Sequence, residues 1–214
     1  LQKIAHNHSL SLIEDSCEAL GATYKGRKAG TLAEIGVFAF YPNKQMTTGE
    51  GGMLVTNQDE RAALFRSLRN QGRDTFDEWL NHTRLGYNYR LDEMSAALGL
   101  SQLRRIDDLL QARKRVAKWY NTRLSPLPEV QVPFVSSDTT EMSWFVYVIR
   151  VDSRDARDGL LEHLKSKDVP SRPYFTPIHL QPFYKQRFGY NEGDFPVTER
   201  AGDTCLALPF SSVM

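Results

Sequence analysis

A lysine and an aspartate each follow an apolar segment in the first part of the chain. Lys44 comes shortly after the segment 35–42, whose apolar residues occupy odd and even positions alike, and Asp15 follows the segment 10–14. Strands that are apolar on both faces are typical of sheets covered on both sides, and open α/β sheets bind ligands beyond the carboxyl ends of their strands. We therefore predict a buried lysine and a buried acid at one edge of one sheet.

This pair of side chains suits a cofactor that carries an aldehyde and a basic ring nitrogen. Pyridoxal 5'-phosphate (PLP) has both groups: a lysine forms the Schiff base with the aldehyde, and an aspartate commonly pairs with the pyridinium nitrogen. Each residue also has an ordinary interpretation. Lys44 alone would be a solvated turn residue before the glycine-rich hairpin at 49–52, and Asp15 alone would cap a helix or a turn. Finding the two together favours the cofactor site.

Four blocks of sequence carry a resemblance to a known family. They are 14–22 (EDSCEALGA), 38–44 (FAFYPNK), 48–52 (TGEGG) and 85–90 (LGYNYR). Together they resemble the DegT/DnrJ/EryC1/StrS family of sugar aminotransferases. The resemblance implies an α/β fold of the PLP-dependent, aspartate aminotransferase-like type (fold type I). This chain would hold part of the large mixed-sheet domain and a smaller α+β C-terminal domain.

The resemblance also implies roles for four residues. Lys44 would hold the cofactor and move a proton between the substrate carbon and the cofactor, while Asp15 would keep the ring nitrogen protonated. Glu18 is a cofactor-binding candidate because it stands where many relatives carry a glutamine near the phenolic oxygen of the cofactor. A carboxylate there would repel the phenolate, so Glu18 is expected to be protonated, rotated away or bonded to another donor. Asn88 would reach the cofactor phosphate of a neighbouring subunit, which implies a homodimer with shared active sites.

Ala39 departs from the family pattern. Relatives often carry a serine at this position that hydrogen-bonds the cofactor phosphate, and alanine has no hydroxyl group to do so. We expect Ser16, backbone amides or a helix start outside this chain to supply the missing contact.

The implied reaction transfers an amino group to a nucleotide-linked keto sugar, with glutamate as the expected donor. The resemblance extends to perosamine synthases, and so to the biosynthesis of cell-surface polysaccharides or glycans. Arg172, Tyr174 and His179 form a candidate substrate cluster in the C-terminal part of the chain, although each of them would serve equally well in packing.

Two other functions stay open at this point. The dehydratase branch of the family replaces the Schiff-base lysine with histidine, so Lys44 argues against a PLP-dependent sugar dehydratase. A non-catalytic binding or regulatory protein on the same fold remains an alternative, particularly for this chain alone. The chain has no initiator methionine and lacks the front of the family pattern, so we expect a fragment that is inactive by itself.

The composition argues against several classes of partner. The 214 residues contain 27 Lys plus Arg against 26 Asp plus Glu, a balance that favours neither nucleic acid nor a membrane surface as a ligand. Cys17 and Cys205 offer neither a disulfide framework nor the spacing of metal ligands, so no metal site is expected. Because no apolar stretch is long enough to span a bilayer, we expect a cytoplasmic protein.

Periodicity predicts the elements that carry these residues. Apolar residues recur at three- and four-residue steps over 92–124, which predicts one long helix with a bend near Gly99. The prolines in 125–128 end that helix. We place the domain boundary there, with a cofactor-binding part at 1–124 and a small domain at 129–214.

Further elements are predicted on either side of this boundary. Before it we expect a hairpin in 21–30, a strand at 52–56, a helix over 58–69 capped by Asn57, and a loop over 72–83 whose Phe76 and Trp79 pack. After it we expect a strand over 144–151, a helix over 154–167, an extended stretch over 172–179 and a helix over 197–205.

Overall fold

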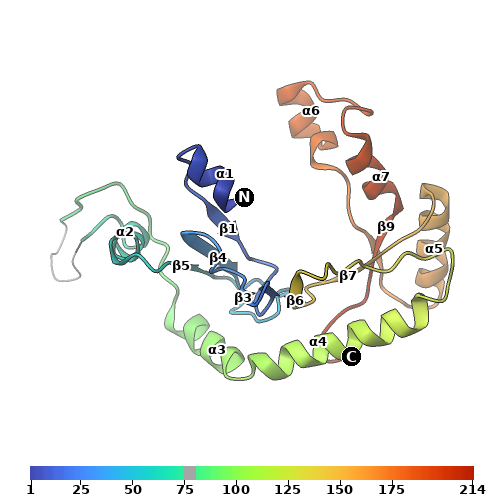
Figure 1. Ribbon diagram of the computed structural model, residues 1–214, viewed down its shortest axis with the longest axis horizontal. Helices are drawn as coiled ribbons and strands as arrows, with labels where there is room; N and C mark the ends of the chain where they lie inside the picture. Colours follow the sequence, from blue (N-terminus) through green and yellow to red (C-terminus); the bar gives the residue numbers. More distant parts are fainter. Residues whose placement is uncertain (75–80) are drawn as a thin grey trace. The chain divides into compact units, whose positions relative to one another are not determined.

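The structure of the chain is a computed structural model that describes residues 1–74 and 81–214 (Figure 1), so Phe76 and Trp79 of the predicted loop lie outside the described residues. The helices are α1 (Gln2–Asn7), α2 (Asp59–Arg69), α3 (Glu93–Leu103), α4 (Ile106–Leu124), α5 (Arg154–Ser166), α6 (Pro182–Phe188) and α7 (Pro196–Thr204), with a short 3-10 helix η1 (Ile178–Leu180). The strands are β1 (Ile13–Asp15), β2 (Thr23–Tyr24), β3 (Arg27–Lys28), β4 (Ile35–Ala39), β5 (Gly52–Val55), β6 (Thr139–Glu141), β7 (Tyr147–Arg150), β8 (Arg172–Pro173) and β9 (Cys205–Leu208).

The chain divides into two compact units. Unit 1 holds Leu1–Gln111 and Ser136–Phe145, and unit 2 holds Ala112–Val135 and Val146–Met214. This division differs from a boundary at 125–128 for two physical reasons. The second half of α4 buries Val116 and Ala117 in unit 2, and β6 returns to unit 1 because it pairs with β2.

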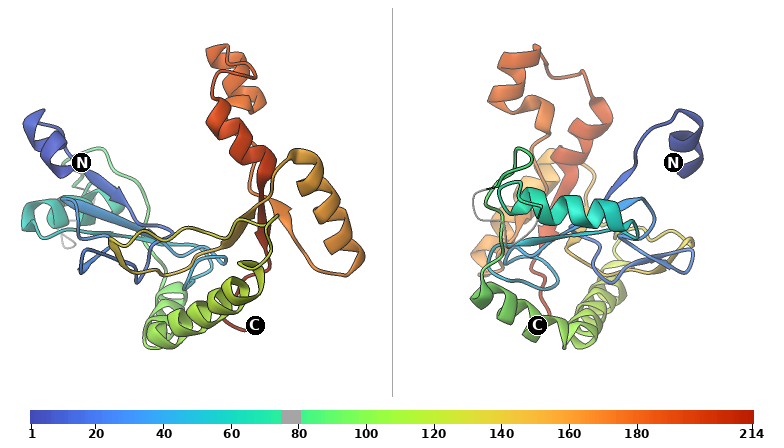
Figure 2. Two further views of the ribbon diagram at one scale, coloured as in Figure 1. Left: turned by 45° about the vertical axis from the view of Figure 1, so that its right-hand side comes forward. Right: turned by 90° about the vertical axis from the view of Figure 1, so that its left-hand side faces the viewer.

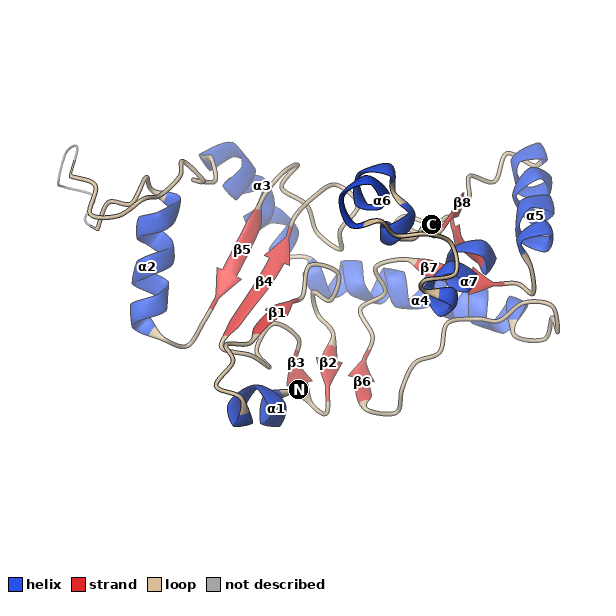
Figure 3. Ribbon diagram, turned by 90° about the horizontal axis from the view of Figure 1, so that it is seen from above, coloured by secondary structure: helices blue, strands red, loops and turns tan. Residues whose placement is uncertain are grey.

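The main sheet of unit 1 has the strand order β1-β4-β5 (Figure 3). Strand β1 pairs in parallel with β4, and Asp15 lies opposite Val37. Strand β5 pairs with β4 in the antiparallel direction. Since β1 and β4 run the same way, their carboxyl ends meet at one edge, as the sequence predicts for Asp15 and Lys44.

This sheet is less covered than predicted. Ile13 on β1 and Met53 and Leu54 on β5 are about half exposed or more. Both strands lie at the edges of a three-stranded sheet, so part of their apolar surface meets solvent in this chain. The prediction that Asp15 is buried is wrong for the same reason: it ends an edge strand and is exposed.

A small second sheet completes unit 1, with the order β3-β2-β6. The hairpin predicted in 21–30 is confirmed, because β2 and β3 pair in the antiparallel direction. The third strand, β6, has the sequence Thr-Thr-Glu. It has no apolar alternation, so its sequence gave no sign of a strand.

The long helix predicted over 92–124 is two helices, and Gly99 is not the break (Figure 2). The chain turns at Arg104 and Arg105, between α3 and α4. Asp107 and Asp108 lie in the first turn of α4, where negative charge favours a helix start. Gly99 instead permits close packing, since a Cβ there would lie 2.9 Å from the Thr48 Cγ2 atom.

Unit 2 is built on the antiparallel sheet β7-β9-β8. Its core includes Tyr147, Ile149 and Leu206, which are almost fully buried. The helix predicted over 154–167 is observed as α5, which Ser153 caps by accepting a hydrogen bond from the Ala156 amide. The stretch 172–179 is extended only in part, because η1 begins at Ile178.

Two kinds of feature are absent from the described residues. Within 1–74 and 81–214, no helix is both long and apolar enough to cross a membrane. The same residues contain no group of three or more His, Cys, Asp or Glu side chains placed to hold a metal ion.

Candidate active site

Lys44 lies in a closed loop that follows β4. Phe40, the first residue after the strand, is buried, and its carbonyl accepts hydrogen bonds from the Thr48 amide at 2.9 Å and the Thr47 hydroxyl at 2.9 Å. The Lys44 amide donates to the Tyr41 carbonyl at 3.0 Å. These bonds fold the loop back on the end of β4, so the lysine is held at the carboxyl edge of the sheet.

The Lys44 ammonium group has an anionic partner and an aromatic partner. Its Nζ atom lies 3.2 Å from Glu18 Oε1 and 4.5 Å from the centre of the Phe145 ring. The Lys44 side chain is only 14% exposed, whereas that of Glu18 is 53% exposed. The lysine is therefore largely shielded from water, as predicted, while its carboxylate partner remains accessible.

Asp15 ends β1 and is held as a carboxylate. The backbone amide of Cys17 donates to Asp15 Oδ1 at 3.1 Å. Hydrogen bonds from Cys17 and, to a smaller extent, the charge of Lys44 lower the pKa of Asp15 below its ordinary value. Burial and the neighbouring Asp15 raise the pKa of the Cys17 thiol to about 11, which excludes a reactive thiolate at neutral pH.

Ser16 is not available to replace the serine that Ala39 lacks. It is almost fully buried, and its hydroxyl donates to Glu14 Oε1 at 3.0 Å. The Glu14 carboxylate also accepts from the amides of Gly30 at 2.7 Å and Leu32 at 2.8 Å. Ser16 therefore belongs to an internal network that fixes β1 against the 30–32 turn, and this expected compensation is wrong.

The sequence does not predict two residues that contact the loop carrying Lys44 or belong to it, Gln45 and Phe145. Gln45 is buried, and its Nε2 atom donates to the Glu18 carbonyl at 2.7 Å and to the Ser143 hydroxyl at 3.1 Å. Phe145 supplies the ring beneath Lys44. Gln45 adjoins Lys44 in the chain and could have been noted for that reason, whereas no signal links positions 143 and 145 to the loop.

Asn88 lies in an exposed segment beside the end of α2. Its backbone forms a bridge with Asn70, and the Arg90 guanidinium donates to Asn70 Oδ1 at 2.7 Å. Tyr87 and Tyr89 stack on one another with ring centres 5.1 Å apart. The structure therefore pairs Asn88 with Asn70 and not with the loop that carries Lys44.

Of the predicted substrate cluster, the structure brings two residues together. Tyr174 and His179 line one cavity within unit 2, and Arg172 does not. Arg172 is an exposed residue of β8. His179 is buried, and its Nε2 atom lies 2.9 Å from Glu199 Oε1.

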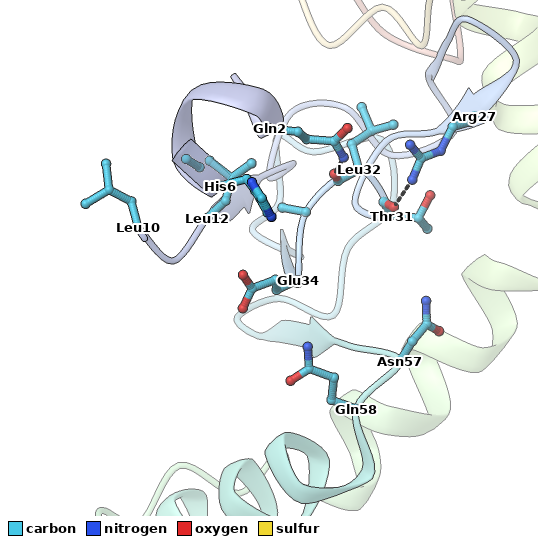
Figure 4. Close-up of a pocket in the computed structure, with 12 residues that line it drawn as sticks. Gln2, His6, Leu10, Leu12, Arg27, Thr31, Leu32, Glu34, Asn57 and Gln58 are labelled. Atoms are coloured by element: carbon cyan, nitrogen blue, oxygen red, sulfur yellow. Dashed lines mark hydrogen bonds between the residues drawn. The ribbon is translucent and has the colours of Figure 1, made fainter. Parts of the chain in front are cut away.

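A separate cavity of about 440 Å³ lies at the opposite edge of the main sheet (Figure 4). It is lined by residues that precede β1 and β4 or follow β5, among them His6, Glu34 and Asn57. The Arg27 guanidinium beside it donates to the Thr31 carbonyl. It contains none of the predicted site residues.

The geometry defines an α/β protein in which a shielded lysine and an ionised aspartate meet at the carboxyl edge of a mixed sheet. The chain belongs to the DegT/DnrJ/EryC1/StrS aminotransferase family, whose sequence model matches residues 1–214. The predicted family is therefore confirmed.

Two relatives of this chain are, by name, a perosamine synthase and a polysaccharide biosynthesis protein. GDP-perosamine synthase of Caulobacter vibrioides is 39% identical over 210 residues, which cover 97% of this chain and 55% of that protein. The spore coat polysaccharide biosynthesis protein SpsC of Bacillus subtilis is 34% identical over 219 residues, which cover 96% of this chain and 56% of that protein. The chain thus spans about half the length of these relatives.

Solved structures confirm the predicted fold class. DesV from S. venezuelae matches with a TM-score of 0.90 at 32% identity, over 99% of this chain and 55% of that one. The putative sugar aminotransferase Spr1654 from Streptococcus pneumoniae, in its PLP form, matches with a TM-score of 0.86 at 26% identity, over 96% of this chain and 54% of that one.

Proposed function

We propose that the full-length protein containing this chain is a PLP-dependent aminotransferase that acts on a nucleotide-linked keto sugar. The proposal rests on the placement of Lys44 and Asp15 at one carboxyl edge of the main sheet. The parallel strands β1 and β4 place them there, because Asp15 ends β1 and Lys44 follows β4. Membership of the aminotransferase family and the similarity to a GDP-perosamine synthase support it.

The residues at this edge fit the cofactor. Lys44 offers a shielded amine, and Asp15 offers a carboxylate whose lowered pKa keeps it ionised at neutral pH, as a partner of a protonated ring nitrogen requires. When bound, PLP supplies an electron sink that stabilises negative charge on a substrate carbon.

The protein's own side chains would then handle the proton. The Lys44 amine accepts the proton from the amino-donor Cα, and the resulting ammonium group pairs with Glu18 Oε1, which lies 3.2 Å from Nζ in this structure. The ring of Phe145 lies beneath the same cation. Both contacts stabilise the charged lysine between proton transfers.

The remaining site residues are proposed to contact the substrate and the cofactor phosphate. Tyr174 and His179 would contact the nucleotide-linked substrate, and the cavity that both of them line supports this; Arg172 would contribute charge near it. Asn88 would reach the cofactor phosphate of a second subunit in a homodimer with shared sites, and its exposure supports that role. We further propose glutamate as the amino donor and the cytoplasm as the location.

One alternative keeps the fold without the reaction. A binding or regulatory protein on this fold would hold a nucleotide sugar and transfer nothing. The dehydratase alternative is disfavoured because Lys44, and not histidine, occupies the position after β4.

The test is mass spectrometry of the full-length protein, incubated with PLP, glutamate and a panel of nucleotide-linked keto sugars. The proposal expects conversion of at least one ketone to an amine, together with 2-oxoglutarate from the donor. Tight binding of a nucleotide sugar without any aminated product would support the non-catalytic alternative instead.

A further inference from the structure

Unit 2 contains a cavity of about 650 Å³ with an aromatic lining. The residues come from the stretch before η1, from η1, from α6, from the loop 189–195 and from α7, which follow one another along the chain (Figure 1). The rings that line it are those of Tyr174, Phe175, Tyr184, Phe188, Tyr190 and Phe195. This volume lies within the usual range for small-molecule sites.

The rings form a continuous wall that is open to solvent. Ring centres are 5.8 Å apart for Tyr184 and Phe188, 5.8 Å for Phe188 and Tyr190, and 5.5 Å for Tyr190 and Phe195. Phe175 and Phe188 are each more than half exposed. A contiguous exposed apolar surface that is also concave marks a binding site.

One polar group is fixed in this wall. His179 lines the cavity, and its ring contacts that of Phe195 with centres 4.7 Å apart. Its Nε2 atom is engaged by Glu199, which also accepts from the amides of Gly193 at 2.8 Å and Phe195 at 3.1 Å. Because these bonds lower the pKa of Glu199, the carboxylate is ionised and Nε2 carries the proton.

The Glu199 bonds have two consequences for the cavity. They hold the loop 189–195 in place, which positions Tyr190 and Phe195. They also leave Nδ1 as the imidazole nitrogen that can bond a ligand, since no hydrogen bond of that atom occurs among the described residues 1–74 and 81–214. Arg187 adds a cation next to the wall, 5.7 Å from the centre of the Phe188 ring.

We propose that this cavity binds the base of the nucleotide-linked substrate, an inference that rests on the proposed function. Bases stack on aromatic side chains whatever their identity, and the wall of rings offers several such surfaces. The Nδ1 atom of His179 bonds an edge of the base, and Arg187 faces the diphosphate. An aliphatic ligand would use neither the imidazole nor the planar faces.

The test compares two phenylalanines of the same helix. Phe188 lines the cavity and is 54% exposed, while Phe183 is 61% exposed and lies outside it. Calorimetry on the full-length protein measures binding of GDP, of dTDP and of pyrophosphate, which has no base. Phe188→Leu should raise the Kd of at least one nucleotide about tenfold, equal to about 1.4 kcal/mol, and leave pyrophosphate binding unchanged.

Two further variants make the result decisive. Phe183→Leu should bind all three ligands as the wild type does, and Phe188→Tyr, which keeps the ring, should restore the nucleotide affinity. Equal losses for nucleotide and pyrophosphate would overturn the inference, because the change would not concern the base. The absence of nucleotide binding to the wild type would overturn it too.

The outcome is separable from that of the proposed function. If the wild type aminates a nucleotide-linked sugar while Phe188→Leu binds nucleotides normally, the reaction stands and the base site lies elsewhere. If nucleotides bind in a manner that depends on Phe188 but no ketone is aminated, the base site stands and the reaction is wrong.

Discussion

Three neighbouring residues determine the environment of the Lys44 ammonium group. Glu18 and Phe145 both contact the ammonium group, and Gln45 fixes the backbone of Glu18. The sequence predicts Lys44, Asp15 and Glu18 as site residues because each lies at or near the end of a predicted strand and within a block that resembles the family. It does not predict Phe145, which is remote in the chain and reaches the lysine only through tertiary folding.

Asp15→Asn should separate cofactor binding from catalysis in the full-length protein. Asparagine has nearly the same shape but cannot hold a ring nitrogen protonated, so the variant should bind PLP and abstract the Cα proton at least about 10²-fold more slowly. Single-turnover measurement with deuterated and protonated donor gives this rate directly. Turnover near that of the wild type would show that Asp15 does not support the electron sink.

At the scale of elements, periodicity locates helices better than it locates their ends. The stripe over 92–124 correctly indicates helical structure, yet it passes through Arg104 and Arg105, where the chain turns. No glycine or proline marks that turn, and the acidic first turn of α4, with Asp107 and Asp108, is only a weak local signal of it. The sequence does not predict β6, and the extended stretch predicted over 172–179 is longer than β8. Both strands are only two or three residues long, which is too short to show an alternation of apolar and polar residues.

The loop between α6 and α7 depends on one carboxylate, which gives a pH prediction. Hydrogen bonds from the Gly193 amide, then from His179, then from the Phe195 amide lower the pKa of Glu199 from its ordinary 4.5. Because the pKa of Glu199 is lower in the folded protein, its ionisation stabilises the fold at pH values above the ordinary pKa. This stabilisation is lost as the pH falls through the lowered pKa of the folded state. Glu199→Gln should therefore lower stability at pH 7 and make less difference as the solution is acidified.

Chemical unfolding of wild type and variant across this pH range measures the effect. Glu162→Gln, an exposed position on α5, serves as the control and should shift the midpoint little at any pH. A difference between wild type and Glu199→Gln that grows on acidification would mean that Glu199 is not the group that is stabilised as an anion.

At the scale of the whole molecule, the chain spans about half the length of its relatives. A proposed phosphate ligand, Asn88, is assigned to the site of a second subunit, so each proposed site draws on two chains. The sequence resemblance supplied this assignment, and the exposure of Asn88 agrees with it. The periodicity of this chain alone does not predict a second subunit.

Mixing two inactive variants tests the shared site. Full-length Lys44→Ala and Asn88→Ala subunits, once exchanged, should recover activity, because one site of each hybrid dimer receives both intact residues. Random exchange makes half of the dimers hybrid, so about a quarter of the wild-type activity is expected. No recovery after exchange verified by native mass spectrometry would place Asn88 in its own subunit's site, or in none.

The central claim is that Lys44 bonds the cofactor, and peptide mapping tests it most directly. The full-length protein is loaded with PLP, reduced with borohydride to fix the linkage, and digested. A single labelled peptide that contains Lys44 is expected, with no visible cofactor absorbance or label in Lys44→Ala. A label on any other lysine, or a Lys44→Ala variant that is labelled as the wild type is, would contradict it.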